Sequence, residues 1–256
     1  MTPVLDLSPA PGAAPFPRMV LAQAGSEVRT MLRNGEQLLL TLIIPVLLLV
    51  GFSLAPLVDV GGGRRVDFLV PGVLALAVMS TAFTGQAIGT GFERRYGVLK
   101  RLGATPLSRA GLMLAKTAAV VAVEVIQAAV IVAVGLALGW RPHGSFLAAA
   151  VLVVLGTAAF SGLGLLMAGT LRAEATLAAA NLVYLVLLGA GGVIFPLSKF
   201  PEGARPVLEL LPISALTGGL RAVLAQGAAL PLGPVLVLAG WAALTLALVS
   251  RLFRWE

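Results

Sequence analysis

The sequence predicts an all-α integral membrane protein with six transmembrane helices, and three observations lead to this fold class. Of the 256 residues, 59% are hydrophobic and only 11% are charged, whereas about 25% of the residues in a soluble domain are charged. Six apolar segments are long enough for a spanning helix, which needs about 20 residues. The basic residues lie mostly in the short connections between these segments, as is typical of membrane proteins.

Two regions precede the first apolar segment. Residues 1–17 are rich in proline and alanine and lack the pattern of a cleaved signal peptide, so we expect a mobile tail. Residues 18–37 mix apolar and charged side chains, which predicts an amphipathic helix lying in the membrane interface. The charged residues that characterise this interfacial helix are Arg18, Glu27, Arg29 and Arg33.

One transmembrane domain, residues 18–256, is expected to contain all six spans. The predicted spans are residues 38–58, 68–90, 111–139, 145–171, 177–195 and 232–250. Pro45 lies inside the first span and is expected to kink it, which a membrane helix tolerates when neighbours satisfy the freed carbonyl. The small residues of segment 156–170 favour close helix packing within the subunit, with a seam between two copies as the alternative.

The connection between the fifth and sixth spans, residues 195–227, is long and is interrupted by proline and glycine. It cannot cross the membrane as one helix, so we predict a re-entrant helical pair that enters and leaves on one side. The residues that characterise this segment are Pro196, Pro201, Pro206, Pro212 and Arg221.

The distribution of lysine and arginine predicts the orientation of the chain. If the N-terminus lies inside, twelve of the 18 basic residues lie inside and six lie outside. Positive charge is retained on the cytoplasmic side, so we expect a multi-pass protein of the plasma membrane with both termini in the cytoplasm.

The connection after the second span, residues 91–109, concentrates positive charge between two apolar runs. Its basic residues are Arg94, Arg95, Lys100, Arg101 and Arg109. One interpretation is that they only enforce the orientation of the chain. The other is that they belong to a rigid element that a soluble partner can push.

Helix signals in this connection favour the second interpretation. Glu93 precedes Lys100 in an order that suits the helix dipole, and Gly103 can end such a helix. Thr105 and Pro106 are then expected to be the N-cap and the first residue of the next helix. The pattern therefore predicts a short helix held between two spans.

The same residues resemble the ABC-2 type permeases, which are six-span subunits of ATP-binding-cassette exporters of the daunorubicin-resistance and polysaccharide-export types. The matching elements are Pro71–Gly72 at the opening of span two, Glu93–Leu102, Thr105–Arg109, and the later turn with Leu211, Pro212 and Arg221. The family often has asparagine where this chain has Leu211. The resemblance covers most of residues 18–250.

The resemblance implies that the basic connection is a coupling helix that docks on a separate ATPase subunit. The residues that it places at this surface are Glu93, Arg94, Arg95, Tyr96, Gly97, Lys100, Arg101, Thr105 and Pro106. Gly97 would allow close approach of the partner, and the interfacial helix would touch the same subunit. ATP and Mg²⁺ would be used by that partner, and the permease would be a homodimer or a heterodimer with a related chain.

Motifs for independent chemistry are absent from the sequence. No stretch fits G-x-x-x-x-G-K-[ST], the phosphate-binding loop, and no hydrolase or metalloprotease motif is present. The chain has no cysteine and one histidine, His143, so we expect neither a metal site nor a bound cofactor. The net charge of +7 does not indicate nucleic-acid binding, because the basic residues follow the membrane topology.

One acid, Glu124, lies in the middle of the third span, and Gln127 follows on the same helix face. An acid in the membrane normally faces protein or a water-filled cavity. Glu124 is therefore expected either to contact a polar part of a cargo or to bond a second helix, for example at Asn181 or Gln86. These four residues are our candidates for the translocation path.

The function favoured by these observations is that of a membrane subunit of an exporter that moves an amphiphilic drug, lipid or lipid-linked glycan. A membrane scaffold or assembly factor is one alternative, and it would need neither an ATPase nor a coupling helix. An ion-coupled secondary transporter is another, although it usually needs more ionisable groups in the membrane than the one found here.

Overall fold

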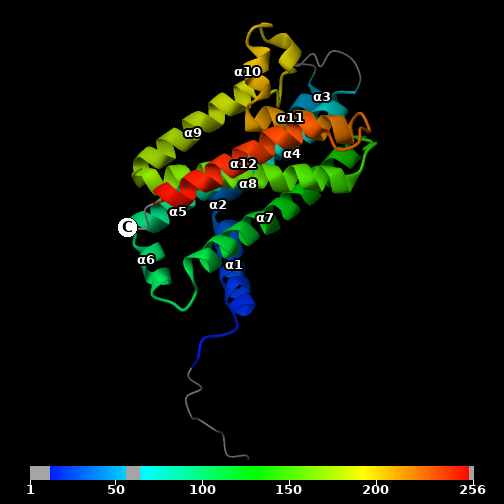
Figure 1. Cartoon of the computed structure of the whole chain (residues 1–256). Coiled ribbons are helices and arrows are strands. Elements are labelled where there is room, and N and C mark those ends of the chain that lie inside the picture. The colour runs from blue at the N-terminus through cyan, green and yellow to red at the C-terminus, as the bar shows by residue number, and fades with distance from the viewer. Residues whose placement is uncertain (1–11, 56–63, 254–256) are drawn as a thin grey trace, which may run out of the picture.

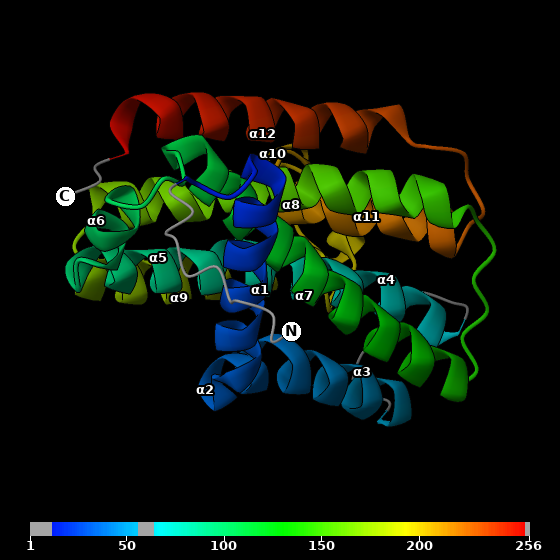
Figure 2. The ribbon, with the colours of Figure 1, turned by 90° about the horizontal axis from the view of Figure 1, so that it is seen from below.

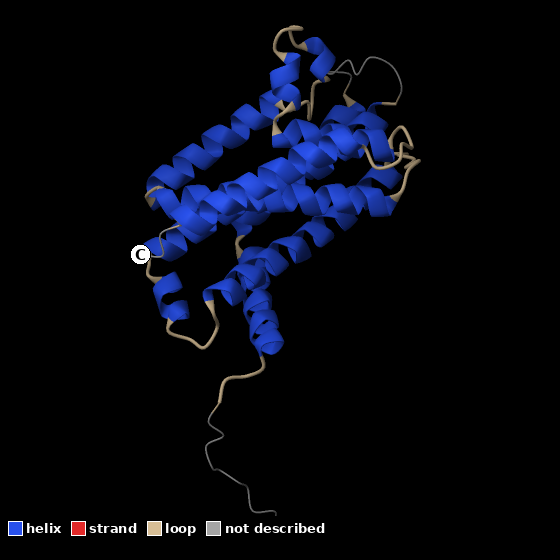
Figure 3. Ribbon diagram, viewed as in Figure 1, coloured by secondary structure: helices blue, strands red, loops and turns tan. Residues whose placement is uncertain are grey.

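The computed structural model describes residues 12–55 and 64–253, which fold into helices and loops with no strand among them (Figure 3). The predicted all-α class is therefore confirmed for this part of the chain. The elements, in order, are α1 Phe16–Arg33, α2 Gly35–Leu38, η1 Leu39–Ile43, α3 Ile44–Leu54, α4 Arg65–Val78, η2 Met79–Gly85, α5 Gln86–Arg95, α6 Val98–Gly103, α7 Arg109–Ala137, α8 Phe146–Thr170, α9 Ala173–Ala190, η3 Leu197–Lys199, α10 Arg205–Glu209, α11 Pro212–Leu224 and α12 Leu232–Leu252.

Five helices of the described residues are long and apolar enough to cross a membrane. They are Arg65–Arg95, which joins α4, η2 and α5, and then Ala110–Ala137, Phe146–Thr170, Ala173–Ala190 and Leu232–Leu252. They correspond to the second to sixth predicted spans. The fifth begins four residues earlier than predicted, because Arg172 has extended backbone and the helix starts directly after it.

The first predicted span, residues 38–58, contains a shorter apolar helix, Thr41–Leu54. The last residues of the predicted span, 56–58, lie outside the described range, and so does most of the predicted tail, residues 1–17. Pro45 occupies the first turn of α3, directly after the π-helical stretch η1. Pro45 therefore lies inside one continuous helix, and a local π-helical adjustment of this kind is one way in which a membrane helix tolerates proline.

The long helices run side by side between two ends of the molecule (Figure 1). We call one the α6 end, which also holds the start of α7 and the last turn of α12. The other is the α10 end, where α10 and the loop between α7 and α8 lie. Seen from below, α1 runs across the long helices instead of along them (Figure 2).

The core is built around α4, whose residues from Leu69 to Val78 are all buried. A spanning helix that is apolar on every side is expected at the centre of a bundle, because other helices then cover all of its faces. Contacts from α7, α8 and α11 surround it. The fold therefore places the second span, which continues towards the basic connection, at the centre of the subunit.

The small residues of α8 pack within the subunit, as the first interpretation of segment 156–170 holds. A Cβ atom on Gly164 would lie 2.7 Å from the Phe83 carbonyl oxygen, and one on Gly162 would lie 2.1 Å from Thr245 Oγ1. Both glycines are therefore needed for the close approach of α8 to η2 and α12.

Candidate functional site

The basic connection contains a short helix, but it is not the single helix that the sequence predicts. Glu93 lies in the last turns of α5, which is continuous with the second span, and the chain breaks at Tyr96 and Gly97 before α6 begins. Gly97 has a φ angle of +68°, a left-handed conformation that glycine adopts without strain. This glycine is needed for the turn between α5 and α6, whatever its role towards a partner.

The end of α6 is as predicted, whereas the start of the next helix is not. α6 ends at Gly103, in agreement with the sequence. The expected N-cap at Thr105 and Pro106 is wrong, because Ser108 caps α7 and its Oγ accepts a hydrogen bond from the Gly111 amide at 3.1 Å. Thr105 instead closes the preceding turn, donating to the Leu102 carbonyl at 2.6 Å.

An apolar cluster seats α6 on the rest of the subunit. Leu99 of α6 is buried with Leu107 and Leu112, and Met19 of α1 and Phe253 at the C-terminal end pack against this cluster. α6 has only six residues, and an isolated helix of that length is unstable in water. The contacts with this cluster therefore hold α6 in place. The segment is therefore a helix held in place on the surface of the subunit and not a flexible loop.

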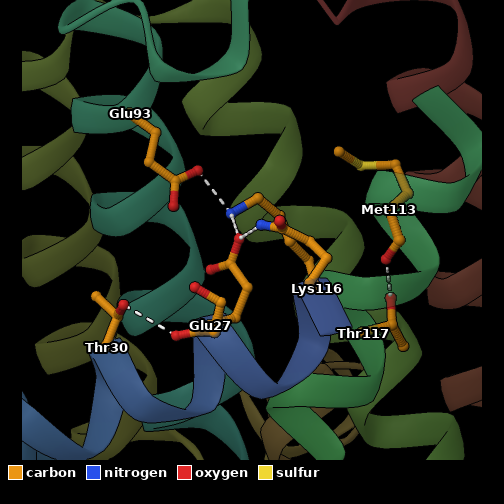
Figure 4. A network of polar contacts seen from close by, with 8 residues as sticks. Glu27, Thr30, Glu93, Met113, Lys116 and Thr117 are labelled. Carbon is orange, nitrogen blue, oxygen red and sulfur yellow. Dashed lines mark hydrogen bonds and ion pairs between the residues drawn. The ribbon is translucent and has the colours of Figure 1, made fainter. Parts of the chain in front are cut away.

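A buried triad of charged side chains joins three elements beside α6 (Figure 4). Lys116 of α7 lies between two acids, with its Nζ atom 2.6 Å from Glu93 Oε2 and 3.2 Å from Glu27 Oε1. The lysine side chain is only 6% exposed, and Gln23 donates a further hydrogen bond to Glu27 at 3.0 Å. The triad ties the interfacial helix α1 to the end of the second span and to the start of α7.

The four charged residues predicted for the interfacial helix divide into two groups. Glu27 turns inward to the triad, whereas Arg18, Arg29 and Arg33 are exposed. The helix crosses α7 and packs against it, and its buried residue is Ala24. This division agrees with a helix that has one face on protein and a basic face outward.

The basic residues of the connection also divide by their contacts. Arg94 donates to the Leu171 carbonyl, and Arg95 pairs with Glu174 in the first turn of α9. By contrast, Tyr96, Lys100 and Arg101 are exposed at the α6 end. The connection was expected to act as one surface, but Arg94 and Arg95 are bonded to residues of the subunit itself, although the Arg95 side chain remains 48% exposed.

The polar residues of the spans bond to different partners from those expected. Thr157 of α8 donates to Glu124 Oε2 at 2.6 Å, so neither Asn181 nor Gln86 is the hydrogen-bond partner of this acid. The second carboxylate oxygen of Glu124 is buried and has no partner among the described residues. Glu124 therefore links α7 to α8 and retains one unused acceptor.

Gln127 links three elements at its own level. Its Nε2 atom donates to the Thr41 carbonyl of η1 at 2.8 Å and lies 2.8 Å from Thr81 Oγ1 of η2. Gln86 is also buried, and neither of its amide atoms has a hydrogen-bond partner in the described part of the chain. Asn181 is exposed on α9. No hydrogen bond joins any two of the four path candidates within the described residues.

At the α10 end, Arg221 of α11 forms a clamp that the sequence did not predict. Its three guanidinium nitrogens donate to the carbonyls of Phe68, Gly192 and Val193 at 3.0, 2.6 and 2.8 Å. The guanidinium carbon also lies 3.4 Å from the centre of the Phe68 ring. A Cβ atom on Gly72 would lie 2.7 Å from the Val193 carbonyl oxygen and 3.0 Å from Arg221 Nη2. Gly72 and Arg221 belong to separate sequence motifs, but they lie next to each other at the Val193 carbonyl.

The prolines of the predicted re-entrant pair mark the ends of short elements. Pro206 and Pro212 lie in the first turns of α10 and α11, Pro196 precedes η3, and Pro201 follows it. α11 has 13 residues and is too short to span a membrane. Its face with Ile213, Leu216 and Leu220 is buried against α4, α8 and α12.

Comparison with protein families gives a match to the model described as ABC-2 type transporter, over residues 20–225. This range is well over half of the chain and runs from α1 to the end of α11. The chain belongs to the ABC-2 type transporter family. No curated protein sequence matches it significantly.

Membership in the ABC-2 type transporter family makes the chain a multi-pass membrane permease subunit of an ATP-binding-cassette transporter. Such a permease typically lacks the ATPase and works with a separate one. The family resemblance seen in the sequence is therefore confirmed. No group of three or more His, Asp or Glu side chains within the described ranges is arranged to hold a metal.

Proposed function

We propose that this ABC-2 type permease is the membrane subunit of an exporter, and that its partner ATPase docks on α6. The observation that carries the proposal is the exposed pair Lys100 and Arg101 on α6, with exposed Tyr96 in the turn before it, on a helix held by buried Leu99. A charged surface on a fixed element can both attract a soluble partner and receive force from it. Because no phosphate-binding loop is present in the sequence, the energy of ATP must come from that partner.

Two connections link the docking surface to the spanning helices. α5 connects α6 directly to the buried second span, and the triad at Lys116 connects α5 to α1 and α7. A displacement of α6 by the ATPase therefore moves three helices together. In this proposal, both termini and the α6 end lie in the cytoplasm, and the α10 end with its re-entrant segment faces outward, in the plasma membrane.

Reversal of the exposed charges tests the docking surface. We expect Lys100→Glu with Arg101→Glu to abolish co-purification of the ATPase while the amount of permease in the membrane stays unchanged. The matched control is Arg64→Glu with Arg141→Glu, two exposed charges at the α10 end. Unchanged ATPase binding by the first variant contradicts the docking proposal and favours a scaffold that needs no ATPase.

We further propose that two copies, or this chain and a related one, form a path for an amphiphilic cargo such as a drug, a lipid or a lipid-linked glycan. The candidates for contacting it are Glu124, Gln127, Gln86 and Asn181. Glu124 supports the proposal because one carboxylate oxygen is buried without a partner in the described residues. That oxygen is suited to a cationic or hydroxyl group of a cargo.

Glu124→Gln keeps the shape of the side chain and the hydrogen bond from Thr157, and removes the charge. If Glu124 contacts a cationic cargo, this substitution lowers cargo-stimulated ATPase activity roughly tenfold or more, since charged hydrogen bonds contribute about 1.5–3 kcal/mol. Thr157→Val serves as the comparison, because it removes only the bond between α7 and α8. Unchanged export with a reduced yield of folded protein would show that Glu124 is a structural partner.

A further inference from the structure

Pro45 deprives one carbonyl of the first apolar helix of its usual donor. In an α-helix, each amide bonds to the carbonyl four residues earlier, and proline has no amide hydrogen. The carbonyl that Pro45 cannot bond is that of Thr41, which lies in the π-helical stretch η1. Thr41 is buried, so a replacement donor for this carbonyl has to come from the protein.

Gln127 of α7 supplies such a donor. Its Nε2 atom donates to the Thr41 carbonyl at 2.8 Å, although the two residues are 86 positions apart in the sequence. A proline, a π-helical stretch and a side chain bonded into the carbonyl ladder are each known causes of bending in a helix. All three meet where η1 joins α3, so this junction is the point at which the first apolar helix bends most easily.

The same amide group also holds the second span, at a π-helical stretch of that span. The Thr81 hydroxyl lies within hydrogen-bond distance of both amide atoms of Gln127, 2.8 Å from Nε2 and 3.0 Å from Oε1. Thr81 belongs to η2, which lies between the central helix α4 and α5, and α5 leads to α6. Thr81 and Gln127 are buried, and η1 and η2 are in contact. One buried side chain therefore bonds to the π-helical stretches of two neighbouring helices.

From this geometry we propose that Gln127 is a positioning residue that passes movement of α6 to the first apolar helix, which bends at Pro45. The inference rests on the proposed docking of the ATPase on α6. A displacement of α5 is taken up at η2, because a π-helical turn interrupts the regular ladder of an α-helix. Thr81 moves with η2, Gln127 follows Thr81, and the Thr41 carbonyl follows Gln127. α3 then tilts relative to the other helices.

Fluorescent reporters on single cysteines test this movement, because the whole chain contains no cysteine. One protein carries a bimane label on Leu47→Cys, an exposed position of α3, and another carries it on Ala104→Cys, an exposed position directly after α6. Both are full chains in lipid nanodiscs, and we expect the ATPase with ATP to change both signals. In Gln127→Leu, the Ala104 reporter should still respond, whereas the response at Leu47 should be lost. An unchanged response at Leu47 in Gln127→Leu would overturn the proposal.

Thr81 separates transmission of movement from packing. Thr81→Ser keeps the hydroxyl group and should preserve the response of the Leu47 reporter. Thr81→Val keeps the branched shape but has no hydroxyl, so the bond between Gln127 and η2 is lost and the response should be lost with it. A response that persists in Thr81→Val would show that movement reaches α3 by another route, which contradicts the proposal.

The Thr41 carbonyl gives a second test, because Pro45→Ala restores an amide that can bond it. Alone, Gln127→Leu should raise the equilibrium constant for unfolding in lipid–detergent micelles by roughly tenfold or more, as expected when a buried polar group loses its partner. In the Pro45→Ala chain, the effect of Gln127→Leu should be smaller by a factor of at least about two, the lower end of the coupling between contacting residues. Equal effects in the two backgrounds would overturn the role of Gln127 at Pro45.

The unmodified chain with its two reporters separates this proposal from the proposed function. If the ATPase with ATP changes the Ala104 signal but not the Leu47 signal, the transmission to α3 is wrong and docking on α6 stands. If neither signal changes, docking on α6 falls together with the role proposed for Gln127.

Discussion

Removal of Lys116 is expected to destabilise the subunit more than removal of any exposed cation. In Lys116→Met, Glu27 and Glu93 lose the cation that holds them together, and two acids remain close in a partly buried site. At distances of 2.6 and 3.2 Å and an effective dielectric constant of about 20, the two attractions are about 6 and 5 kcal/mol before the desolvation of the ions is subtracted. Measured losses on removing one partner of a buried pair are about 3–5 kcal/mol, which is the expected decrease in the free energy of unfolding.

The assay is reversible unfolding in lipid–detergent micelles, with Lys100→Met as the control. Because Lys100 is exposed, its substitution should change the free energy of unfolding by no more than about 0.5 kcal/mol. The triple variant Glu27→Gln, Glu93→Gln, Lys116→Met should recover most of the loss, since it leaves no buried charge unpaired. Equal effects of Lys116→Met and Lys100→Met, or no recovery in the triple variant, would refute the reasoning.

Two glycines give further predictions, each with a control glycine that has open space around it. Gly72→Ala places a Cβ atom 2.7 Å from the Val193 carbonyl oxygen, beside the hydrogen bonds of Arg221. Thermal unfolding in micelles should therefore show that the free energy of unfolding falls by about 2–3 kcal/mol. The control Gly89→Ala should leave this free energy unchanged or slightly increase it. Gly97→Ala forces alanine into a φ angle of +68°, which should lower the free energy of unfolding by about 1 kcal/mol and weaken ATPase binding. The control Gly103→Ala should change neither the free energy of unfolding nor ATPase binding. Equal behaviour within either pair would contradict the role assigned to that glycine.

Features that depend on local sequence could be predicted for this protein. The lengths of the apolar runs located five helices that can span a membrane, because the bilayer thickness fixes the number of residues that they need. The end of α6 at Gly103 was also predictable, since a helix often stops at glycine. Among the described residues, five helices and not six are long enough to span a membrane, because the first apolar helix, Thr41–Leu54, is shorter.

Features that depend on contacts between distant segments were missed. Lys116 and Glu27 are 89 residues apart in the sequence, and their charges read as two independent surface groups until α1 is placed across α7. The same holds for Gly72 and Arg221, which meet only when α11 packs on α4. Serine and threonine are both favoured N-cap residues, so residue type alone does not select Ser108, the observed cap of α7, over the predicted Thr105.

The central claim is that α6 lies in the cytoplasm and receives the ATPase, and chemical labelling of Lys100→Cys tests it most directly. In this cysteine-free chain, a membrane-impermeant maleimide should label Lys100→Cys only from the cytoplasmic side of vesicles, and added ATPase should protect it. Arg141→Cys at the α10 end should be labelled only from the opposite side and should not be protected. Labelling of Lys100→Cys from the outer side, or labelling that the ATPase does not change, would contradict the account.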